Sequence, residues 1–507
     1  MPYSTVLHAI LATLVIDDAR SQLRSLFRTQ LCGDLEAIVD VVVEFFATPV
    51  APAAMTRFEE RVAEGLCEVG RRLMAVSLNR VEPAAEQLPA SLRWDGGDYR
   101  RLNQATANRH VATCFGTITL MRHGYRPHDR DSGEATIFPL EQALGLTESA
   151  TPAFAKRVGR YLAEAGATQD RVLERLSAEH GVSMGVKRLR SLASSLSEAM
   201  TPHRHDAQVE RVLDLLEQAH AGKGSRKPVL AVGRDGITLG TQPTGRYEVA
   251  SVATVTVYDR RRRRLGTVQL ARVPEPGQGT LSGELTRLVE DVLRRWDERG
   301  RPLPRFCYVT DAGDNEVSYF RRTLRRLRHP RTGKKLRWQW IVDYYHATER
   351  ISVLADLLFG PGREGQAWAR KMRKLLLKPG GVRRVLLSAA ALRTTRGLRA
   401  KHEPAYRRAY NYLRARSRHM DYHGFRRLGL PIGSGVTEAA CKTVFTQRLK
   451  LSGMRWKGPG AQVILNLRVI LLSGIWDEVH ARTSAAQSQA QTRTHACCEA
   501  NQACMAA

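Results

Sequence analysis

The sequence lacks an apolar run long enough to cross a bilayer. A membrane-spanning helix needs roughly 18 consecutive apolar residues, and the N-terminal apolar stretch, Val6 to Ile16, is shorter than that. This stretch has no basic lead-in and stops at Asp17 and Asp18, so it is interpreted as a buried helix rather than a signal peptide. These absences exclude a membrane protein and lead us to expect a cytoplasmic one.

Paired cysteines are also missing. The 507-residue chain has eight cysteines but no C-x-x-C pair, which excludes the spacing of a zinc ribbon. Scattered thiols in a chain of this length are typical of a reducing cytosol. At roughly 100–200 residues per domain the length predicts about three or four domains, large enough to bury a core without disulfides or structural metals.

Acidic residues are scarce relative to basic ones. The chain has 50 Asp and Glu against 79 Lys and Arg, a net charge of +29. Between Arg321 and Arg427 there are 29 basic and 6 acidic residues, a local net charge of +23, with Tyr and Trp interleaved. Cations neutralise phosphates and aromatic faces stack on bases, so nucleic acid is the preferred partner. The alternative is a solvated helical face over an aromatic core.

The first 227 residues are predicted to form three regions: helices over 1–90, a small β module over 91–150 and helices over 151–222. In the third region, a helix over 170–178 precedes a break and a basic helix over 184–196 that carries Lys187, Arg188 and Arg190. This pattern fits a helix-turn-helix motif with its second helix in the major groove of DNA, and it also fits a plain helical hairpin. The clearest linker follows at 222–228.

After the linker the pattern changes to strands that alternate with helices. We expect strands at 229–239, 248–259 and 265–273, a helix at 281–296, a strand at 306–315, a helix at 317–327 and a strand at 338–347. This order predicts an α/β fold with a mixed, RNase H-like sheet over 228–480. A basic helical insertion is predicted over 348–430, and a tail over 481–507, rich in Ala, Gln, Ser and Thr, is predicted to be disordered.

Three acids lie at strand ends and at a helix start, the positions of such a sheet at which functional residues are expected. Asp235 is expected to end the first strand, Asp311 to end the fourth, and Glu438 to open a helix behind Ser434 as N-cap. Three convergent carboxylates repel one another unless cations lie between them, and hard oxygen ligands suit Mg²⁺ or Mn²⁺. Two such ions can support phosphoryl displacement.

Each acid also has an ordinary structural interpretation. Asp235 precedes Gly236 and fits a turn. Asp311 fits a helix N-cap, and Asp314 competes with it for either role. Glu438 fits a residue that favours a helix N-terminus electrostatically. It is the placement of all three at the expected points of one fold that favours a catalytic set.

At these residues the sequence resembles bacterial insertion-sequence transposases of the DDE class, and most closely the Kra-type family. The resemblance rests on RDGI around Asp235, YVTDAGDNEVSYF around Asp311, IVDYYHATERI around Asp343 and GSGVTEAACKTVFTQRLKLSGMRWKG around Glu438. It covers about residues 110 to 480 and is strongest from 229 onward. It implies that Asp235, Asp311 and Glu438 are the catalytic triad and bind two Mg²⁺ or Mn²⁺ ions.

The resemblance also implies the partners and the activity. It predicts metal-dependent DNA cleavage and strand transfer on double-stranded DNA, namely the transposon ends and a target, by a nucleoid-associated homodimer or larger assembly. It further implies that the helical stretch between Asp311 and Glu438 is an insertion domain. A structure-specific nuclease without strand transfer and a transposase-derived DNA-binding protein are the rival functions.

Two further groups of residues are singled out by the same motifs. Asp343 and His346 fill a D-x-x-H pattern similar to one in Mutator-like transposases, in which His346 either orients substrate near the metals or buttresses the strand end. Basic and aromatic side chains past the catalytic helix either grip DNA near the cut or form a solvated turn: Arg448, Lys450, Arg455 and Trp456.

One departure from the family concerns the β module. Relatives often carry a cysteine pair after the segment that corresponds to HVATCFGTITLMRHGYRP, whereas this chain continues with Tyr125, Arg126, Pro127 and His128. We therefore predict no structural zinc.

Overall fold

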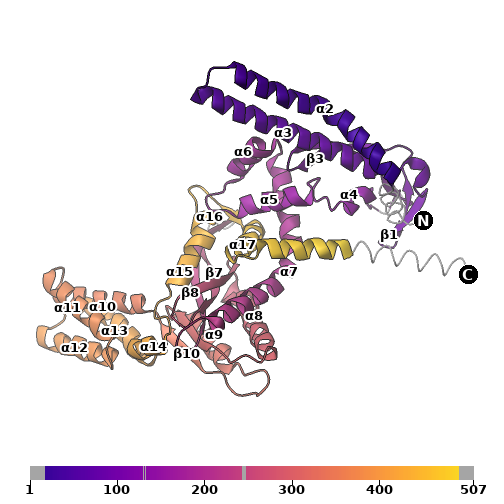
Figure 1. The fold of residues 1–507 in the computed structure, drawn as a ribbon. Helices are drawn as coiled ribbons and strands as arrows, with labels where there is room; N and C mark the ends of the chain where they lie inside the picture. Colours follow the sequence, from indigo (N-terminus) through magenta and orange to yellow (C-terminus); the bar gives the residue numbers. More distant parts are fainter. Residues whose placement is uncertain (1–16, 130, 132, 243–246, 490–507) are drawn as a thin grey trace, which may run out of the picture. The chain divides into compact units, whose positions relative to one another are not determined.

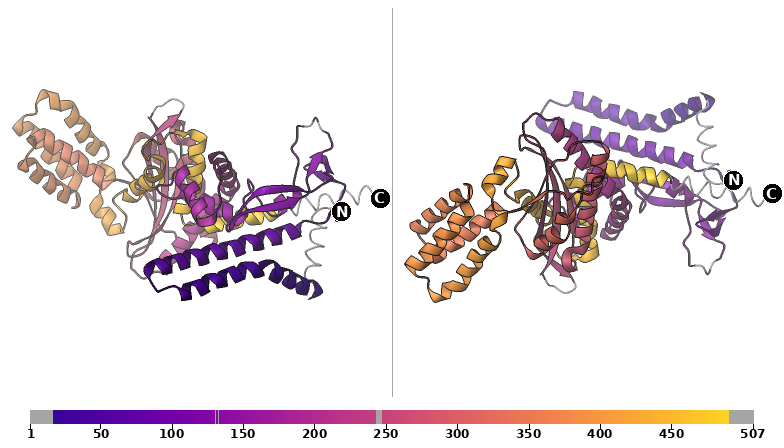
Figure 2. Two further views of the ribbon diagram at one scale, coloured as in Figure 1. Left: turned by 90° about the horizontal axis from the view of Figure 1, so that it is seen from above. Right: turned by 90° about the horizontal axis from the view of Figure 1, so that it is seen from below.

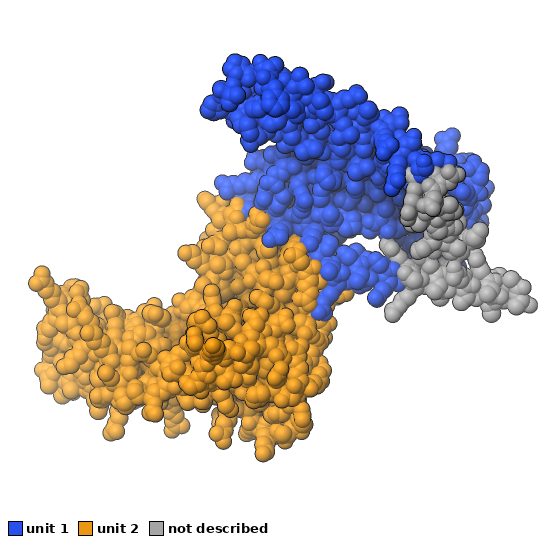
Figure 3. Space-filling model, in the orientation of Figure 1, with its two compact units in different colours: residues 1–162, 167–200, 480–507 blue, residues 163–166, 201–479 orange. Residues whose placement is uncertain are grey.

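The computed structural model describes residues 17–129, 131, 133–242 and 247–489, and its described part is a mixed α/β protein, as predicted. The chain divides into two compact units (Figure 3). Unit 1 comprises residues 1–162, 167–200 and 480–507, and unit 2 comprises residues 163–166 and 201–479. The linker predicted at 222–228 lies inside unit 2, and the division between the units falls within a helix.

Unit 1 is helical at first and then contains short strands. Helices α2 (Asp17–Ala47) and α3 (Pro52–Val81) lie side by side (Figure 1). The strands form a three-stranded sheet of β1 (Ser91–Trp94), β2 (Gly97–Arg101) and β5 (Tyr125–Pro127), and a hairpin of β3 (Thr106–Thr113) and β4 (Gly116–Arg122). Helices α4 (Pro139–Ala143), α5 (Pro152–Ala163) and α6 (Gln169–His180) follow.

The helix after α6 is much longer than the sequence pattern indicated. Gly181 ends α6 in the left-handed conformation, and α7 runs from Val186 to Ala221, where we expected a helix that stops at 196. It continues through Pro202 because its later part is anchored in unit 2, where Val212 and Leu216 are buried in the core.

The predicted disordered tail begins inside a helix, Trp476–Gln489. Ala and Gln are good helix formers, which accounts for helix in a segment whose composition suggested disorder; residues 490–507 lie outside the described residues. No single helix among the described residues is long and apolar enough to cross a membrane. The bent pair Gly458–Leu472 and Trp476–Gln489 passes that test of length and composition together.

Unit 2 is built on a mixed sheet whose elements follow the predicted order. Its main strands are β6 (Val229–Gln242), β7 (Tyr247–Tyr258), β8 (Arg264–Arg272), β9 (Arg305–Thr310) and β10 (Trp338–Val342). They lie side by side in the order β10-β9-β6-β7-β8, and the short β11 (Trp456–Lys457) pairs with the end of β6. The β6–β7 and β7–β8 pairs are antiparallel, whereas β9 runs parallel to both β6 and β10.

Three strand ends differ clearly from the prediction. The strand predicted at 306–315 ends at Thr310, because the chain turns at Asp311 and α9 begins at Asp314. Asp235 does not end β6, because β7 continues to pair with this strand as far as Gly240 opposite Tyr247. The last predicted strand, 338–347, ends at Val342, because the Asp343 side chain accepts the backbone N–H of His346 and caps the next helix.

Helices cover the sheet and extend from its β10 edge. Helix α8 (Gly279–Glu298) joins β8 to β9, and α9 (Asp314–Arg322) joins β9 to β10. After β10 the chain forms a helical lobe that projects from the sheet (Figure 2): α10 (Tyr344–Phe359), α11 (Arg363–Leu376), α12 (Gly381–Arg396), α13 (Glu403–Ala415) and α14 (Tyr422–Leu428). The chain then returns through α15 (Gly435–Ala440), a π-helical turn (Cys441–Thr446), α16 (Gln447–Leu449) and α17 (Gly458–Leu472).

The register of the parallel strands positions the candidate site. The β6–β9 pairing ends at Gly233 opposite Val309, so Asp235 and Asp311 each follow by two residues and lie at the same level. The β9–β10 pairing ends at Thr310 opposite Val342, and the Asp343 N–H donates to the Thr310 carbonyl at 2.8 Å. Three aspartates from three adjacent strands therefore stand in one row.

Helix α15 docks on this sheet through a contact that leaves no room for a side chain on Gly233. A Cβ there would lie 2.0 Å from Oγ1 of Thr437 on α15 and 2.9 Å from Oγ1 of Thr254 on β7. The two hydroxyls are hydrogen-bonded to each other at 2.8 Å.

We predict that Gly233→Ala lowers the free energy of unfolding by about 1–3 kcal/mol, because the added methyl overpacks this contact. Thermal and chemical unfolding of the full chain measure the change. The matched control is Gly283→Ala in α8, where a Cβ meets nothing within 4 Å; replacing a helical glycine there raises stability by roughly 0.5–1 kcal/mol. A Gly233→Ala variant as stable as wild type would contradict the docking contact.

Candidate metal centre

Asp235 lies inside the sheet with both carboxylate oxygens engaged. Its Oδ1 accepts the N–H of Gly236 at 2.7 Å, and its Oδ2 accepts the thiol of Cys441 at 3.4 Å. Burial raises the pKa of Asp235, and the neighbouring carboxylates of Asp311 and Glu438 raise it further. The three predicted acids, which are far apart in the sequence, are therefore close enough in the fold to act on one another electrostatically.

Asp311 is held in a constrained turn between β9 and α9. Its Oδ1 accepts the N–H of Gly313 at 3.0 Å, and Ala312 has a φ of +65°, in the left-handed region that non-glycine residues rarely adopt. Two side chains of the helical lobe fix this turn, because Tyr412 donates to the Asp311 carbonyl at 2.6 Å and Arg416 donates to the Ala312 carbonyl at 3.1 Å. A constrained backbone of this kind is common at functional sites.

The structure separates Asp311 from its rival Asp314. Asp314 is exposed in the first turn of α9, whereas the carboxylate of Asp311 acts on that of Asp235. The N-cap position of α9 is occupied by Gly313 rather than by either acid. Of the two acids, Asp311 is the one that belongs to the cluster.

Glu438 approaches the aspartates from α15. Its Oε1 accepts the hydroxyl of Ser434 at 2.6 Å, and the Nε2 of His346 lies 3.8 Å from the same oxygen. Ser434 is the N-cap residue of α15, as predicted, but its side chain makes no hydrogen bond with the backbone of the helix. The hydroxyl is turned to the carboxylate one helical turn later, which orients Glu438 instead.

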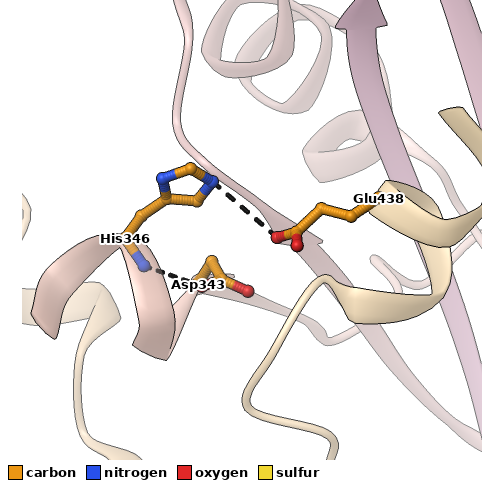
Figure 4. A group of neighbouring side chains, drawn as sticks. All are labelled: Asp343, His346 and Glu438. Carbon is orange, nitrogen blue, oxygen red and sulfur yellow. Dashed lines mark hydrogen bonds and ion pairs between the residues drawn. The ribbon is translucent and has the colours of Figure 1, made fainter. Parts of the chain in front are cut away.

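Asp343 joins the end of β10 to the loop before α15. It is fully buried, its Oδ1 accepts the N–H of His346 at 2.9 Å, and its Oδ2 accepts the N–H of Ser434. One ligand atom each from Asp343, His346 and Glu438 lie within 4.8 Å of one another (Figure 4). Because both oxygens of Asp343 already accept backbone N–H groups, the geometry favours a structural role for Asp343.

His346 has a different position from Asp343. Its Nδ1 is hydrogen-bonded to Oε2 of the exposed Glu349 at 3.1 Å, while its Nε2 faces Glu438. The imidazole thus stands between two carboxylates on the side of the cluster. This arrangement lets His346 orient Glu438, and it keeps open the prediction that His346 acts near bound metal.

The donor set fits a hard divalent cation. Asp235, Asp311 and Glu438 offer carboxylate oxygens only, the ligand type that Mg²⁺ and Mn²⁺ prefer. The adjacent Arg234 does not compensate their charge by hydrogen bonding, because its guanidinium donates to Gln278 at 2.8 Å and to Ser282 at 3.1 Å. A cation among the three acids would reduce their mutual repulsion and would offset the cost of desolvating Asp235.

The three basic residues predicted in the helix-turn-helix candidate differ in their environment. Lys187 is exposed, and Arg190 donates to Oε1 of Gln169 at 2.9 Å. The guanidinium of Arg188 donates to three backbone carbonyls within unit 1, those of His110, Glu148 and Ser149. Arg188 therefore attaches α7 to the β module, and its guanidinium is less available for a contact with DNA. The DNA contacts of Lys187 and Arg190 remain predictions.

The predicted DNA-contacting residues after the catalytic helix also differ in their exposure. Arg448 is 1% exposed, so the prediction that it grips DNA is wrong; burial lowers its pKa to about 10. Its guanidinium lies 5.4 Å from the ring centre of Trp456, whose indole N–H donates to the Leu449 carbonyl at 3.0 Å. Lys450 and Arg455 are exposed, and their DNA contacts remain predictions.

Sequence reasoning missed two residues of this neighbourhood. Cys441 contacts Asp235 and lies one helical turn after Glu438, and burial raises its pKa above the usual range of a thiol. Glu316 lies five residues after Asp311 and is buried beside it. Helical spacing from Glu438 would have suggested Cys441, whereas Glu316 looked like an ordinary acid in the first turn of a helix.

No family model matches the sequence, and no curated protein matches it. The function is therefore inferred from the side chains that the fold brings together. Among the described residues, Asp343, His346 and Glu438 form the group whose ligand atoms lie close enough together to hold a cation, and Asp235 and Asp311 stand in the same row as Asp343. Carboxylates that hold divalent cations near a polyanion are the requirement of metal-dependent phosphodiester chemistry.

We predict that Asp343→Ala destabilises unit 2 by at least about 1–3 kcal/mol, since it leaves buried backbone N–H groups without an acceptor. Unfolding measured in EDTA and in Mg²⁺ should show the same loss in both. The control is Asp356→Ala, which removes an exposed acid farther along the same helix. If Asp343→Ala kept its metal-free stability and lost only stabilisation by Mg²⁺, Asp343 would be a ligand and not a buttress.

Proposed function

We propose that this chain is a DNA transposase of the DDE type, with an RNase H-like catalytic domain in unit 2. The strand order supports the fold: three antiparallel strands, β6 to β8, are followed by β9 and β10, which add in parallel on the other side of β6. The motifs that resemble Kra-type transposases fall on β6, after β9, after β10 and on α15. The observation that carries the proposal is geometric: the β6–β9 register sets Asp235 and Asp311 at one level, and Cys441, three residues after Glu438, contacts Asp235.

The chain's own residues would act by holding and orienting oxygen ligands. Asp235 and Asp311 are fixed by the sheet and by backbone N–H groups, and Glu438 is aimed by Ser434 and His346. Two divalent ions bound by these carboxylates would supply activation of a hydroxyl nucleophile and stabilisation of the leaving oxygen. No Ser or Tyr nucleophile is needed for such a displacement.

The helical lobe supplies the surface for DNA in this proposal. The lobe, residues 344–428, has 20 Lys and Arg against 5 Asp and Glu, a net charge of +15. Several of its cations are exposed on α11, among them Arg370, Lys371 and Lys374. Such cations bind DNA by neutralising phosphates and releasing counterions. A transposase must also bring two DNA ends together, so we propose a homodimer or larger assembly on the DNA.

We predict that Asp311→Asn abolishes Mg²⁺-dependent cleavage of DNA while DNA affinity remains, because the change removes one ligand charge and no basic residue. Cleavage and binding are measured on the same end-containing duplex, with Asp314→Asn as the matched control from the neighbouring exposed position. Persistent cleavage by Asp311→Asn would reject the proposed triad. An assay for joined products separates a transposase from a nuclease without strand transfer.

We also predict that the triple variant Arg370→Ala, Lys371→Ala, Lys374→Ala weakens DNA binding and flattens its salt dependence. The logarithmic slope should fall by up to about 0.9 for each phosphate that the variant no longer neutralises. The control removes cations that face carboxylates: Arg294, Arg299 and Arg301. Equal salt slopes for the triple variant and wild type would remove α11 from the DNA surface.

A further inference from the structure

Three arginines from distant parts of unit 2 meet beside Gly429, the residue that caps the C-terminus of α14. Arg226 precedes β6, Arg262 lies in the turn between β7 and β8, and Arg426 belongs to α14. A Cβ built on Gly429 would lie 2.8 Å from Cδ of Arg226 and 3.9 Å from Cγ of Arg262. The Gly429 N–H donates to the Arg426 carbonyl at 3.2 Å. We call Arg226, Arg262 and Arg426 the arginine cluster.

The positive charges of the arginine cluster are not compensated by acids. Burial lowers the pKa of Arg262, and the charges of Arg226 and Arg426 lower it further. Among the residues that the structure describes, no carboxylate forms an ion pair or a hydrogen bond with any of the three guanidinium groups. Like charges that are held together raise the free energy of the folded state unless an anion lies between them. The cluster therefore has the charge of an anion site.

The turn that carries Arg262 uses its one acid internally. The carboxylate of Asp259 is buried, and it accepts the backbone N–H groups of Arg261 and Arg263 at 2.8 Å each and the Nε–H of Arg263 at 2.9 Å. Arg262 has a φ of +69°, and its N–H donates to the Asp259 carbonyl at 3.0 Å. The backbone of Arg262 is thus fixed by the turn, while its side chain lies near Gly429 without an acidic partner.

The strand register gives the distance from the arginine cluster to the acids. The cluster lies at the end of the sheet where β6 begins, because Arg226 precedes β6 and Arg262 follows β7. Val229 pairs with Tyr258 at that end, and Asp235 comes six residues later along β6. At about 3.3 Å per residue, Asp235 is about 20 Å from Val229. In duplex DNA the same length corresponds to about six base pairs at 3.4 Å each.

We propose that the arginine cluster binds a backbone phosphate of DNA about six base pairs from the phosphodiester held at the metal centre. This inference rests on the proposed function and names a second point at which its substrate is held. Guanidinium groups form charge-assisted hydrogen bonds with phosphate oxygens in a fixed fork geometry. A phosphate contact carries no base sequence, so the cluster positions the duplex and does not read it.

The competing role for these arginines is a general one. Basic side chains on a surface attract DNA through the summed charge of the protein, without a defined site. In that case the loss of any three arginines of unit 2 weakens DNA binding equally, and the length of DNA beyond the cut is unimportant. A defined site predicts that the loss depends on which arginines are removed and on whether the DNA reaches them.

The test uses the full chain and two triple variants with the same change of charge. The first removes the arginine cluster: Arg226→Gln, Arg262→Asn and Arg426→Gln. Asn is chosen at position 262 because it tolerates the left-handed conformation. The control removes arginines that face carboxylates: Arg294→Gln, Arg299→Gln and Arg301→Gln. DNA affinity is measured against salt concentration for end-containing duplexes that are shortened stepwise on each side of the cut, and thermal unfolding checks that each variant is folded.

We expect the cluster variant to bind the longest duplex about tenfold or more weakly than wild type. Its logarithmic salt slope should fall by about 0.9, the value for one phosphate. Wild type should lose affinity in the same way when the DNA on one side of the cut is shorter than about six base pairs. The cluster variant should not respond to that shortening, and the control variant should behave like wild type in every measurement.

The other outcomes separate the possible errors. Equal losses of affinity in both triple variants would mean that summed charge alone attracts DNA, and the inference would be overturned. Wild-type DNA affinity in the cluster variant, with Mg²⁺-dependent cleavage intact, would reject the phosphate site and leave the proposed function standing. If the wild-type chain binds DNA through the cluster but cuts none in Mg²⁺, the proposed function fails while the DNA contact is supported.

A final arm distinguishes DNA from a free phosphate compound as the source of the phosphate. Thermal unfolding of wild type and of the cluster variant is compared in inorganic phosphate and in chloride at equal ionic strength. If phosphate raises the melting temperature of wild type alone while the two proteins bind DNA equally, the cluster binds a free phosphate compound and its assignment to DNA is overturned.

Discussion

Electrostatic repulsion among neighbouring carboxylates, two of them half-buried and the third exposed, is the constraint on which the rest of unit 2 depends. The parallel register of β6 and β9 sets Asp235 and Asp311 at one level, and α15 brings Glu438 to the same place. Such a cluster is unfavourable in a folded protein unless something holds it together and something compensates its charge. The holding groups are the N–H of Gly236, which follows Asp235 within β6, and the N–H of Gly313, which lies in the same turn as Asp311.

The contacts around the cluster hold the Glu438 carboxylate in position, as a binding site requires. Thr437 of α15 packs on Gly233 and is hydrogen-bonded to Thr254. These two contacts fix the position on the sheet of the helix that carries Glu438. Ser434 and His346 then fix the carboxylate within that helix. Ligands held by packing and by further hydrogen bonds lose little freedom on metal binding, which is how proteins keep such sites selective.

The order of the helices and strands in unit 2 and the three main acids could be predicted from the sequence, because both depend on local sequence patterns. Apolar runs that end in carboxylates located β6 and β9, and the rule that such ends gather on one edge of a parallel sheet predicted that Asp235 and Asp311 would meet. Strand limits were less predictable. Asp235-Gly236 has the composition of a turn, yet pairing with β7 carries the strand past it.

Side-chain roles that depend on tertiary contacts could not be predicted in the same way. Arg448 stands in a basic, motif-rich segment and resembles a DNA contact, but the structure buries it beside Trp456. Ser434 occupies the predicted N-cap position, yet its hydroxyl donates to the Glu438 carboxylate instead of bonding to the helix backbone. The length of α7 likewise followed from core residues such as Leu216, since Pro202 alone would have argued for a break.

The contacts of Asp343 explain how a long helical lobe can be placed between two halves of one site. The lobe leaves the sheet immediately after Asp343 and returns just before Ser434, and these residues, 91 positions apart, are joined by a hydrogen bond from the Ser434 N–H to Asp343. The Tyr344 N–H also donates to the Ile432 carbonyl at 2.9 Å, so the two ends of the lobe are fastened at its base. The entropic cost of closing an insertion grows slowly with its length once its ends are held. The lobe can therefore be large and strongly basic without moving Glu438 away from Asp235 and Asp311, while Tyr412 and Arg416 return from it to fix the turn at Asp311.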